Sequence, residues 1–294
     1  SSAASAASAG SAAATAASRA RGAWTPDRAR WRSGDGGSPR VAVLGPIRIT
    51  AAGPPPQRRR RACQELVVYL AARGESGASA VEISHSLWPH QDIPATVRNE
   101  VIASTRRWLG LRPDGQPWLH ESDSAGRYRL DPDVLVDWYL FRRLRARGES
   151  RGVAGAEDLH TALGLVTGAP LHDAERPALA GIRPAYSWLP GTALQPELIL
   201  AGITDTAHEL VEMCLSTGDF DGARHAVGRA WLADPHRSDD QPWRDLLRIA
   251  YAEGNLEEVR TIIADLLRYR DAEHPDELSP ATATLISELL PAPR

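Results

Sequence analysis

The positions of hydrophobic residues between 41 and 94 predict two short strands followed by two helices. VAVLG and PIRIT alternate well enough to form strands, with Gly45 and Pro46 in the turn between them. Helical spacing begins in ACQELVVYLAAR and stops at Gly74. A second helix is expected after Ser79, because the glutamate three residues later, Glu82, completes the pattern of a capping box.

The segment ATVRNEVIASTRRWLG, residues 95–110, predicts a third helix with two unlike sides and Thr96 as a capping candidate. Its apolar stripe consists of Val97, Val101, Ile102, Thr105 and Leu109. The opposite side carries Asn99, Ala103, Arg106 and Arg107. An amide and guanidinium groups are the chemistry that reads base edges and holds phosphates when a helix enters a major groove. Taken alone, such a helix is more often an ordinary solvated one.

A β-hairpin is predicted after the third helix, formed by WLHES, a turn over residues 123–126, and RYRLD. Arg127 and Arg129 alternate with Tyr128 and Leu130, which places the cations on one face and the apolar residues on the other. The order of strands, three helices and hairpin is that of a winged helix. Residues 95–110 occupy the place of the helix that reads DNA in this helix-turn-helix group, so the module as a whole favours DNA binding.

Four consecutive arginines, Arg58–Arg61, stand where the first helix begins. The helix dipole favours acidic residues at this end, so the placement is unusual for a helix start. Phosphate contact would explain it, and a solvated run of charge explains it equally well.

Residues 1–38 predict a flexible linker. The first 18 consist almost entirely of serine and alanine, and such a sequence cannot bury a core. The residues that follow are rich in Arg, Gly, Ser and Pro. A basic arm that follows DNA is the alternative to a plain linker here.

Residues 132–294 predict an all-α domain that contains a repeat. HELVEMCLSTGDFDGA aligns with RDLLRIAYAEGNLEEV at an offset of 36 residues. In this alignment Gly218 and Asp219 match Gly254 and Asn255, which lie between paired helices. A period near this length with a Gly-Asp or Gly-Asn turn is typical of tetratricopeptide repeats, which stack into a concave surface for a protein or ligand.

Charge separates the two modules. Residues 1–40 carry six Arg and two acids, and residues 41–130 carry twelve Arg and eight acids. The remaining residues carry sixteen Arg and twenty-seven acids. A basic first part joined to an acidic second part indicates two modules with different partners.

The residues that could carry chemistry predict no catalytic site, metal site or cofactor. Cys63 and Cys214 lie in apolar helical patterns, which indicates core positions and fits a reducing cytoplasm. The nine histidines lack the spacing of a zinc site, and no glycine loop is followed by Lys-Ser/Thr. No apolar run approaches the roughly 18 residues that cross a bilayer. We therefore expect no enzyme and no membrane contact within these residues.

The order of VAVLGPIRIT, RRRRACQELVVYLA, SLWP, RRWLG and GRYRL resembles the DNA-binding half of actinobacterial regulators of the antibiotic-regulatory-protein type (SARP-like). ALGLVTGAPL, the repeats and ELSPATATLISELL are similar to the bacterial transcriptional activator domain (BTAD) that accompanies it. The resemblance covers about residues 41–290. It implies a mainly α fold, with an OmpR-like winged helix-turn-helix at 39–131 and a tetratricopeptide-like helical domain at 132–294.

The resemblance also implies partners and site residues. It implies a cytoplasmic protein that binds double-stranded DNA, contacts RNA polymerase or another protein through the helical domain, and forms a homodimer. Relatives of this branch also resemble the C-terminal ends of larger, membrane-attached proteins, which the Ser/Ala linker fits. Carried onto this chain, the resemblance implies that Asn99, Arg106 and Arg107 of the third helix and Arg127 and Arg129 of the hairpin would face DNA. The sequence itself adds Arg98 and the run Arg58, Arg59, Arg60 and Arg61 as candidate DNA contacts.

Two functions follow from these patterns. The first is a DNA-binding transcriptional regulator, favoured by Asn99, Arg106 and Arg107. The second is a non-enzymatic interaction or ligand-sensing module at the C-terminal end of a larger protein, with the winged helix not used for DNA. Glu100 favours the second, because an anion beside the candidate face is repelled by phosphates. Whether that face is open separates the two.

Overall fold

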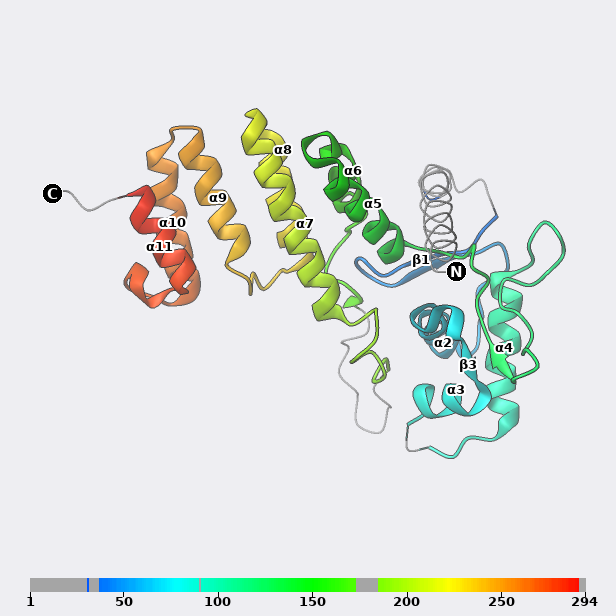
Figure 1. Cartoon of the computed structure of the whole chain (residues 1–294). Helices are drawn as coiled ribbons and strands as arrows, with labels where there is room; N and C mark the ends of the chain where they lie inside the picture. Colours follow the sequence, from blue (N-terminus) through cyan, green and yellow to red (C-terminus); the bar gives the residue numbers. More distant parts are fainter. Residues whose placement is uncertain (1–30, 32–36, 90, 173–184, 291–294) are drawn as a thin grey trace, which may run out of the picture. The chain divides into compact units, whose positions relative to one another are not determined.

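The computed structural model of the protein describes residue 31 and residues 37–89, 91–172 and 185–290 (Figure 1). Nearly all of the linker predicted for residues 1–38 lies outside these residues. The chain forms two compact units. The first comprises the described residues of Ser1–Val43, Ile47–Arg143 and Asp173–Gln195, and the second comprises Leu44–Pro46, Leu144–His172 and Pro196–Arg294. The boundary predicted from the sequence, at 131/132, lies before the point at which the chain passes into the second unit.

A small sheet opens the first unit. Strands β1 (Arg40–Ala42) and β2 (Arg48–Thr50) pair antiparallel, with Val41 opposite Ile49. Strand β5 (Leu135–Val136) adds to β1 in parallel, which gives the order β2-β1-β5. Beyond β1, the Val43 amide donates to both carboxylate oxygens of Asp137, each at 2.9 Å. The two predicted strands are therefore confirmed, and a third strand that the sequence did not reveal completes the sheet.

Three helices follow, as predicted: α2 (Arg60–Arg73), α3 (Ala80–Leu87) and α4 (Ala95–Leu109). A 3₁₀ turn (Gly74–Ser76) and strand β3 (Ala78–Ser79) lie between α2 and α3. The predicted capping box is present, because the Ser79 hydroxyl accepts from the Glu82 amide at 3.3 Å and the Ser79 amide donates to the Glu82 carboxylate at 2.8 Å.

The prediction of Thr96 as a cap was wrong. Helix α4 begins at Ala95, Pro94 occupies the N-cap position, and no side chain caps the helix. Proline holds φ at −58° here, and its carbonyl oxygen accepts the first helical hydrogen bond from the Val97 amide at 2.9 Å. Thr96 therefore lies inside the first turn.

The predicted hairpin is present and has one further neighbour. The His120 amide donates to the Arg129 carbonyl at 3.0 Å, and the Asp123 amide donates to the Arg127 carbonyl at 3.0 Å. Gly126 closes the turn at φ 71°. Strand β4 (Arg127–Tyr128) also pairs antiparallel with β3, which ties the hairpin to the segment before α3.

The second unit is helical. Helix α5 (Asp137–Arg151) runs into it from the first unit and is followed by a 3₁₀ turn (Gly152–Gly155) and α6 (Ala156–Leu163). The remaining helices are α7 (Pro196–Thr217), α8 (Phe220–Ala233), α9 (Gln241–Ala252), α10 (Leu256–Arg270) and α11 (Pro280–Leu289), with a 3₁₀ turn (Pro275–Glu277) before α11. From α6 to α10 each helix packs on the next, as Figure 1 shows.

The internal repeat is visible in the turns between paired helices. Gly218 ends α7 at φ 74°, and Gly254 ends α9 at φ 75°. Asp219 then caps α8 by accepting from the Gly222 amide at 3.0 Å, and Asn255 caps α10 by accepting from the Glu258 amide at 3.1 Å. The two helix pairs are thus built by the same local chemistry, as the sequence alignment predicts.

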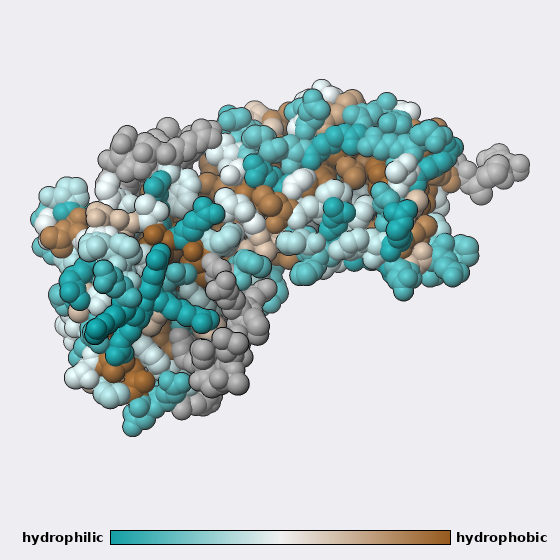
Figure 2. All heavy atoms as spheres, turned by 180° about the vertical axis from the view of Figure 1, so that it is seen from behind, coloured by the Kyte–Doolittle hydropathy of each residue, from teal (hydrophilic) through white to brown (hydrophobic). Residues whose placement is uncertain are grey.

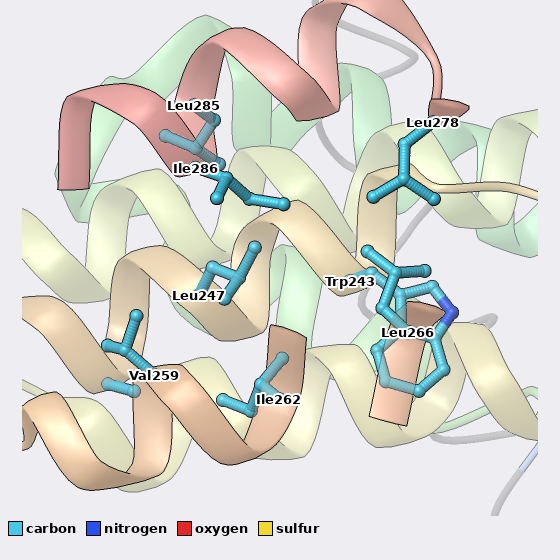
Figure 3. Packing of buried hydrophobic residues seen from close by; sticks show 9 residues of the cluster. Trp243, Leu247, Val259, Ile262, Leu266, Leu278, Leu285 and Ile286 are labelled. Atoms are coloured by element: carbon cyan, nitrogen blue, oxygen red, sulfur yellow. The ribbon is translucent and has the colours of Figure 1, made fainter. Parts of the chain in front are cut away.

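The end of the helical unit has a core of its own (Figure 3). Its side chains come from α9, α10, α11 and the segment before α11. They are Trp243, Leu247, Ala250, Val259, Ile262, Leu266, Leu278, Leu285 and Ile286. Outside such cores, the face of the molecule in Figure 2 shows hydrophobic residues among hydrophilic ones. No helix of the described chain is both long enough and apolar enough to cross a membrane.

Candidate nucleic-acid interface

Helix α4 presents one side to solvent and buries the other. Asn99, Ala103 and Arg107 follow one another at four-residue spacing, and all three are exposed. The buried side consists of Val101, Ile102, Thr105, Trp108 and Leu109. We call the exposed side, Asn99, Ala103 and Arg107, the open face of α4.

Arg106 and Arg107 have different environments although they are adjacent in sequence. Arg106 donates from Nε to the Leu119 carbonyl at 2.9 Å and from Nη2 to the His120 carbonyl at 3.0 Å, and it pairs with Glu121 at 3.1 Å. Arg107 is exposed, and within the described residues it donates only to atoms of its own helix. Arg106 therefore ties α4 to the hairpin, whereas Arg107 belongs to the open face.

The other predicted cations of α4 and the hairpin also have partners within the first unit. The Arg98 Nη1 donates to the Ser84 hydroxyl at 3.3 Å, which connects α4 to α3. Arg129 pairs with Asp123 at 2.5 Å across the hairpin turn. The predicted cationic face of the hairpin is thus neutralised at Arg129 by an acid on the same hairpin.

Arg127 binds the segment before α3. It donates to the Ser76 carbonyl at 2.6 Å and to the Gly77 carbonyl at 3.0 Å, and it pairs with Glu82 at 3.1 Å. Hydrogen bonds from the Ser79 backbone and hydroxyl lower the pKa of Glu82, and Arg127 lowers it further. Arg127 therefore holds the hairpin against the capping box of α3.

Arg58–Arg61 lie at the start of α2, and one of them contacts α4. All four are exposed, and Arg59 takes the N-cap position of α2 at φ 56°. The Arg59 Nε lies 3.4 Å from a Glu100 carboxylate oxygen, which joins the start of α2 to α4. Among the described residues, Arg58, Arg60 and Arg61 form no ion pair. The run and Arg107 together carry five guanidinium groups, and Glu100 pairs with one of them, Arg59.

A buried acid fixes the base of the hairpin. Asp131 is 3% exposed, pairs with Arg112, and lies 3.0 Å from the His120 Nε2. Burial raises the pKa of Asp131, and hydrogen bonds from the Asp133 amide, Arg112 and His120 more than offset this, so that the pKa is lowered. The ionised carboxylate therefore holds the two ends of the hairpin together.

Comparison with known proteins bears on the fold. Neither a family model nor a curated protein matches the sequence. Among solved structures, EmbR of Mycobacterium tuberculosis, determined in complex with a low-affinity phosphopeptide, is similar with a TM-score of 0.58. The fold is EmbR-like. Identity is 17%, and the similarity covers 86% of this chain and 64% of that chain, so this chain spans less than two thirds of that protein's length. A winged helix followed by helical repeats is thus the architecture of the protein.

Sequence patterns did not reveal the Arg59–Glu100 pair. Glu100 reads as an isolated anion on a helix, and Arg59 belongs to a run far earlier in the chain. The sequence shows only that both charges are present, and this does not predict which arginine pairs with which acid. Elsewhere in the described ranges, no group of three or more His, Cys, Asp or Glu residues is placed to hold a metal ion.

Proposed function

We propose that the chain is a DNA-binding transcriptional regulator whose winged helix, residues 39–131, binds double-stranded DNA through the open face of α4. One observation carries this proposal. Asn99 and Arg107 are exposed on α4, and the exposed run Arg58–Arg61 contacts the same helix through the Arg59–Glu100 pair. That combination offers base-reading groups at the centre and phosphate-binding groups beside them.

The open face suits a major groove. An asparagine can bond an adenine with both its donor and its acceptor, and an arginine can bond a guanine with two parallel hydrogen bonds. Ala103, between Asn99 and Arg107, has the smallest side chain with a Cβ and lets the helix approach the base edges closely. Arg58–Arg61 then neutralise phosphates, which supplies affinity without sequence preference.

The remaining candidate cations act on this interface through other elements. Arg98 connects α4 to α3, and Arg106 and Arg127 hold the hairpin in place. Arg129 stabilises the hairpin turn through Asp123. In the proposed function these arginines are positioning residues for the open face, because acids of the first unit pair with Arg127 and Arg129.

The helical domain, residues 132–294, serves protein contact in this proposal. Stacked helix pairs present a surface that suits a polypeptide partner, so RNA polymerase, another regulator or a second copy of the chain would bind there. A regulator of this kind works in the cytoplasm, in a free protein or in the cytoplasmic part of a larger membrane-attached one. No step of the proposed function requires catalysis or a cofactor.

DNA binding is tested by fluorescence anisotropy with a pool of labelled duplexes at rising salt. The logarithm of affinity must fall linearly with the logarithm of salt concentration, because phosphate contacts release counterions. Replacing Arg107 by Gln should weaken binding by about tenfold, the equivalent of one lost base or phosphate contact. The matched control is Arg260→Gln on α10, an exposed arginine of the helical unit. Absence of binding, or equal effects of both variants, would refute the proposal.

A non-enzymatic interaction or ligand-sensing module is the second candidate. It is favoured by the internal partners of Arg106, Arg127 and Arg129 and by Glu100 beside the open face. In this second candidate function, Arg106, Arg127 and Arg129 stabilise the fold and do not contact DNA. The anisotropy experiment then gives no salt-dependent signal, while the helical domain still captures a partner protein.

A further inference from the structure

Three aromatic rings of the helical unit surround one arginine. The Arg237 guanidinium carbon lies 4.3 Å from the ring centre of Trp231, 5.3 Å from that of Trp243 and 5.8 Å from that of Tyr269. Trp231 and Trp243 meet edge to face with centres 5.2 Å apart, and Tyr269 lies 6.0 Å from Trp243. We call Trp231, Trp243 and Tyr269 the aromatic shelf. The cation lies on electron-rich ring surfaces, which attract it and restrict its motion.

The loop that carries Arg237 is held from both sides. Arg237 has a left-handed backbone, with φ at 42°, which costs about 1 kcal/mol for a residue with a Cβ. The Tyr269 hydroxyl donates to the His236 carbonyl at 2.7 Å, and the Arg270 Nη2 donates to the Arg237 carbonyl at 2.9 Å. The Asp234 carboxylate accepts from the Ser238 hydroxyl at 2.7 Å. These bonds fix the position of Arg237 on the aromatic shelf.

The Arg237 side chain has unused hydrogen-bonding capacity. Within the described part of the chain, no acid lies at ion-pair distance from its guanidinium, and the guanidinium donates no hydrogen bond. The neighbouring Arg270, by contrast, pairs with Asp240 at 2.7 Å. A guanidinium carries five N–H donors in a planar fork that matches a carboxylate or phosphate. Stacking on rings leaves the edge of this fork free for such a partner.

A surface pocket of about 320 Å³ opens beside this fork. Its lining consists of Arg237, Trp243, Asp265, Arg268 and Tyr269. Arg268 is a second cation, with a side chain 75% exposed, and it pairs with Asp265 at 2.7 Å. The pocket lies at the small end of the range for ligand sites, so it fits one head group and not a whole drug-sized molecule.

We propose that this pocket binds an oxyanion, a carboxylate or phosphate group carried by a peptide segment of a partner protein. Arg237 donates two parallel hydrogen bonds to the oxyanion, and Arg268 supplies a second positive charge in the pocket lining. The aromatic shelf holds the Arg237 fork in place before binding, which reduces the entropy that binding has to overcome. Helical repeats characteristically bind polypeptides, which favours a peptide as the carrier. This site lies in the helical unit, and the proposal stands whether or not the winged helix binds DNA.

Replacing Asp265 tests whether the pocket binds anions. Asp265 is the acid that lines the pocket, and its charge opposes an incoming anion. Asp265→Asn should therefore strengthen anion binding by severalfold, and it also releases Arg268.

The experiment is a titration of the full chain, followed by NMR at the Arg237 Nε–H and at the indole N–H groups of Trp231 and Trp243. The probes are inorganic phosphate, acetate, capped phosphoserine and capped glutamate, with chloride at equal ionic strength as the reference. We expect saturable shifts with the oxyanions and not with chloride. A larger affinity for phosphate and capped phosphoserine identifies a phosphopeptide as the carrier. A larger affinity for acetate and capped glutamate identifies an acidic peptide.

Two variants separate binding from packing. Arg237→Lys keeps the charge and loses the planar fork, so oxyanion affinity should fall by about tenfold. Asp265→Asn should raise it, and Arg260→Gln on the same unit should leave it unchanged. The proposal is overturned if the shifts with phosphate and acetate match those with chloride. It is equally overturned if the affinities of the Arg237→Lys and Asp265→Asn variants equal that of the wild type.

Discussion

Arg59 and Glu100 form an ion pair of 3.4 Å that joins the start of α2 to the side of α4. Their side chains are 41% and 51% exposed, so the pair is screened by water and contributes little to stability. Its effect is on the electrostatics of the surface. Glu100 engages one arginine of the Arg58–Arg61 run and adds a negative charge next to Asn99 and Arg107.

Replacing Glu100 by Gln should strengthen DNA binding. The substitution removes an anion that phosphates repel and frees Arg59 to contact the backbone. We expect a severalfold higher affinity at low salt and a steeper decline with salt, measured by anisotropy. Glu257→Gln is the control, because Glu257 is an exposed glutamate of α10 that forms a comparable surface pair with Arg260. Unchanged or weaker binding of the Glu100→Gln variant would count against DNA contact at this face.

Replacing Arg106 by Gln should loosen the hairpin, whereas Arg107→Gln should not. Arg106 holds the carbonyl groups of Leu119, a buried residue, and of His120, a half-buried one, and its loss leaves both acceptors short of a donor. A cost of about 1–3 kcal/mol follows. Hydrogen exchange of the amides of residues 118–131 should accelerate only in the Arg106 variant. Equal exchange in both variants would show that Arg106 does not position the hairpin.

Two glycines of the helical unit should respond to alanine in opposite directions. Gly218 has φ at 74° and Gly228 lies within α8, and an added Cβ would meet nothing within 4 Å at either position. Only backbone conformation therefore matters. Gly218→Ala should lower the free energy of unfolding by about 1 kcal/mol, and Gly228→Ala should raise it by up to about 1 kcal/mol. Urea denaturation measures both, and a shift of the same sign in both variants would contradict the assigned helix end.

The helical unit should lose stability as the pH rises through the range in which His208 titrates. The His208 Nδ1 lies 2.8 Å from the buried Asp245 carboxylate, and this hydrogen bond raises the pKa of His208 from its ordinary 6.5, against the effect of burial. Because the folded-state pKa is the higher one, the stabilisation is fully present below about pH 6.5 and is lost as the pH rises through the folded-state value.

The measurement is the difference in unfolding free energy between the wild type and His208→Gln across that pH range. The wild type should exceed the variant by more at about pH 6 than at about pH 8. His85→Gln, at an exposed position of α3, serves as the control. A difference for His208→Gln that does not change with pH would show that the pair with Asp245 is not charge-dependent.

Local chemistry made much of the fold predictable. The capping box at Ser79, the stop at Gly74 and the equivalent turns at Gly218 and Gly254 depend on residues within a few positions of one another. Helical spacing likewise identified the buried side of α4. The pairing of β5 with β1 was not predictable, because it joins two segments far apart in the chain that are each too short to show a pattern.

The candidate interface was predictable only in part for the same reason. Helical spacing places Arg106 and Arg107 on one broad side of α4, and nothing local distinguishes them. The two arginines differ because the hairpin packs against Arg106 and not against Arg107. The position of the hairpin results from long-range packing. The aromatic shelf could not be predicted from the sequence either. Trp231, Trp243 and Tyr269 come from three separate helices and come into contact only in the folded unit.

The central claim is that the open face of α4 contacts DNA, and site-specific photo-crosslinking tests it most directly. A photoreactive residue is placed at Ala103, in the middle of that face, and for comparison at the exposed Ala264 of α10. The proposed function predicts a covalent adduct with a duplex at position 103 that disappears at high salt, and none at position 264. No adduct at position 103, or equal adducts at both positions, would contradict it.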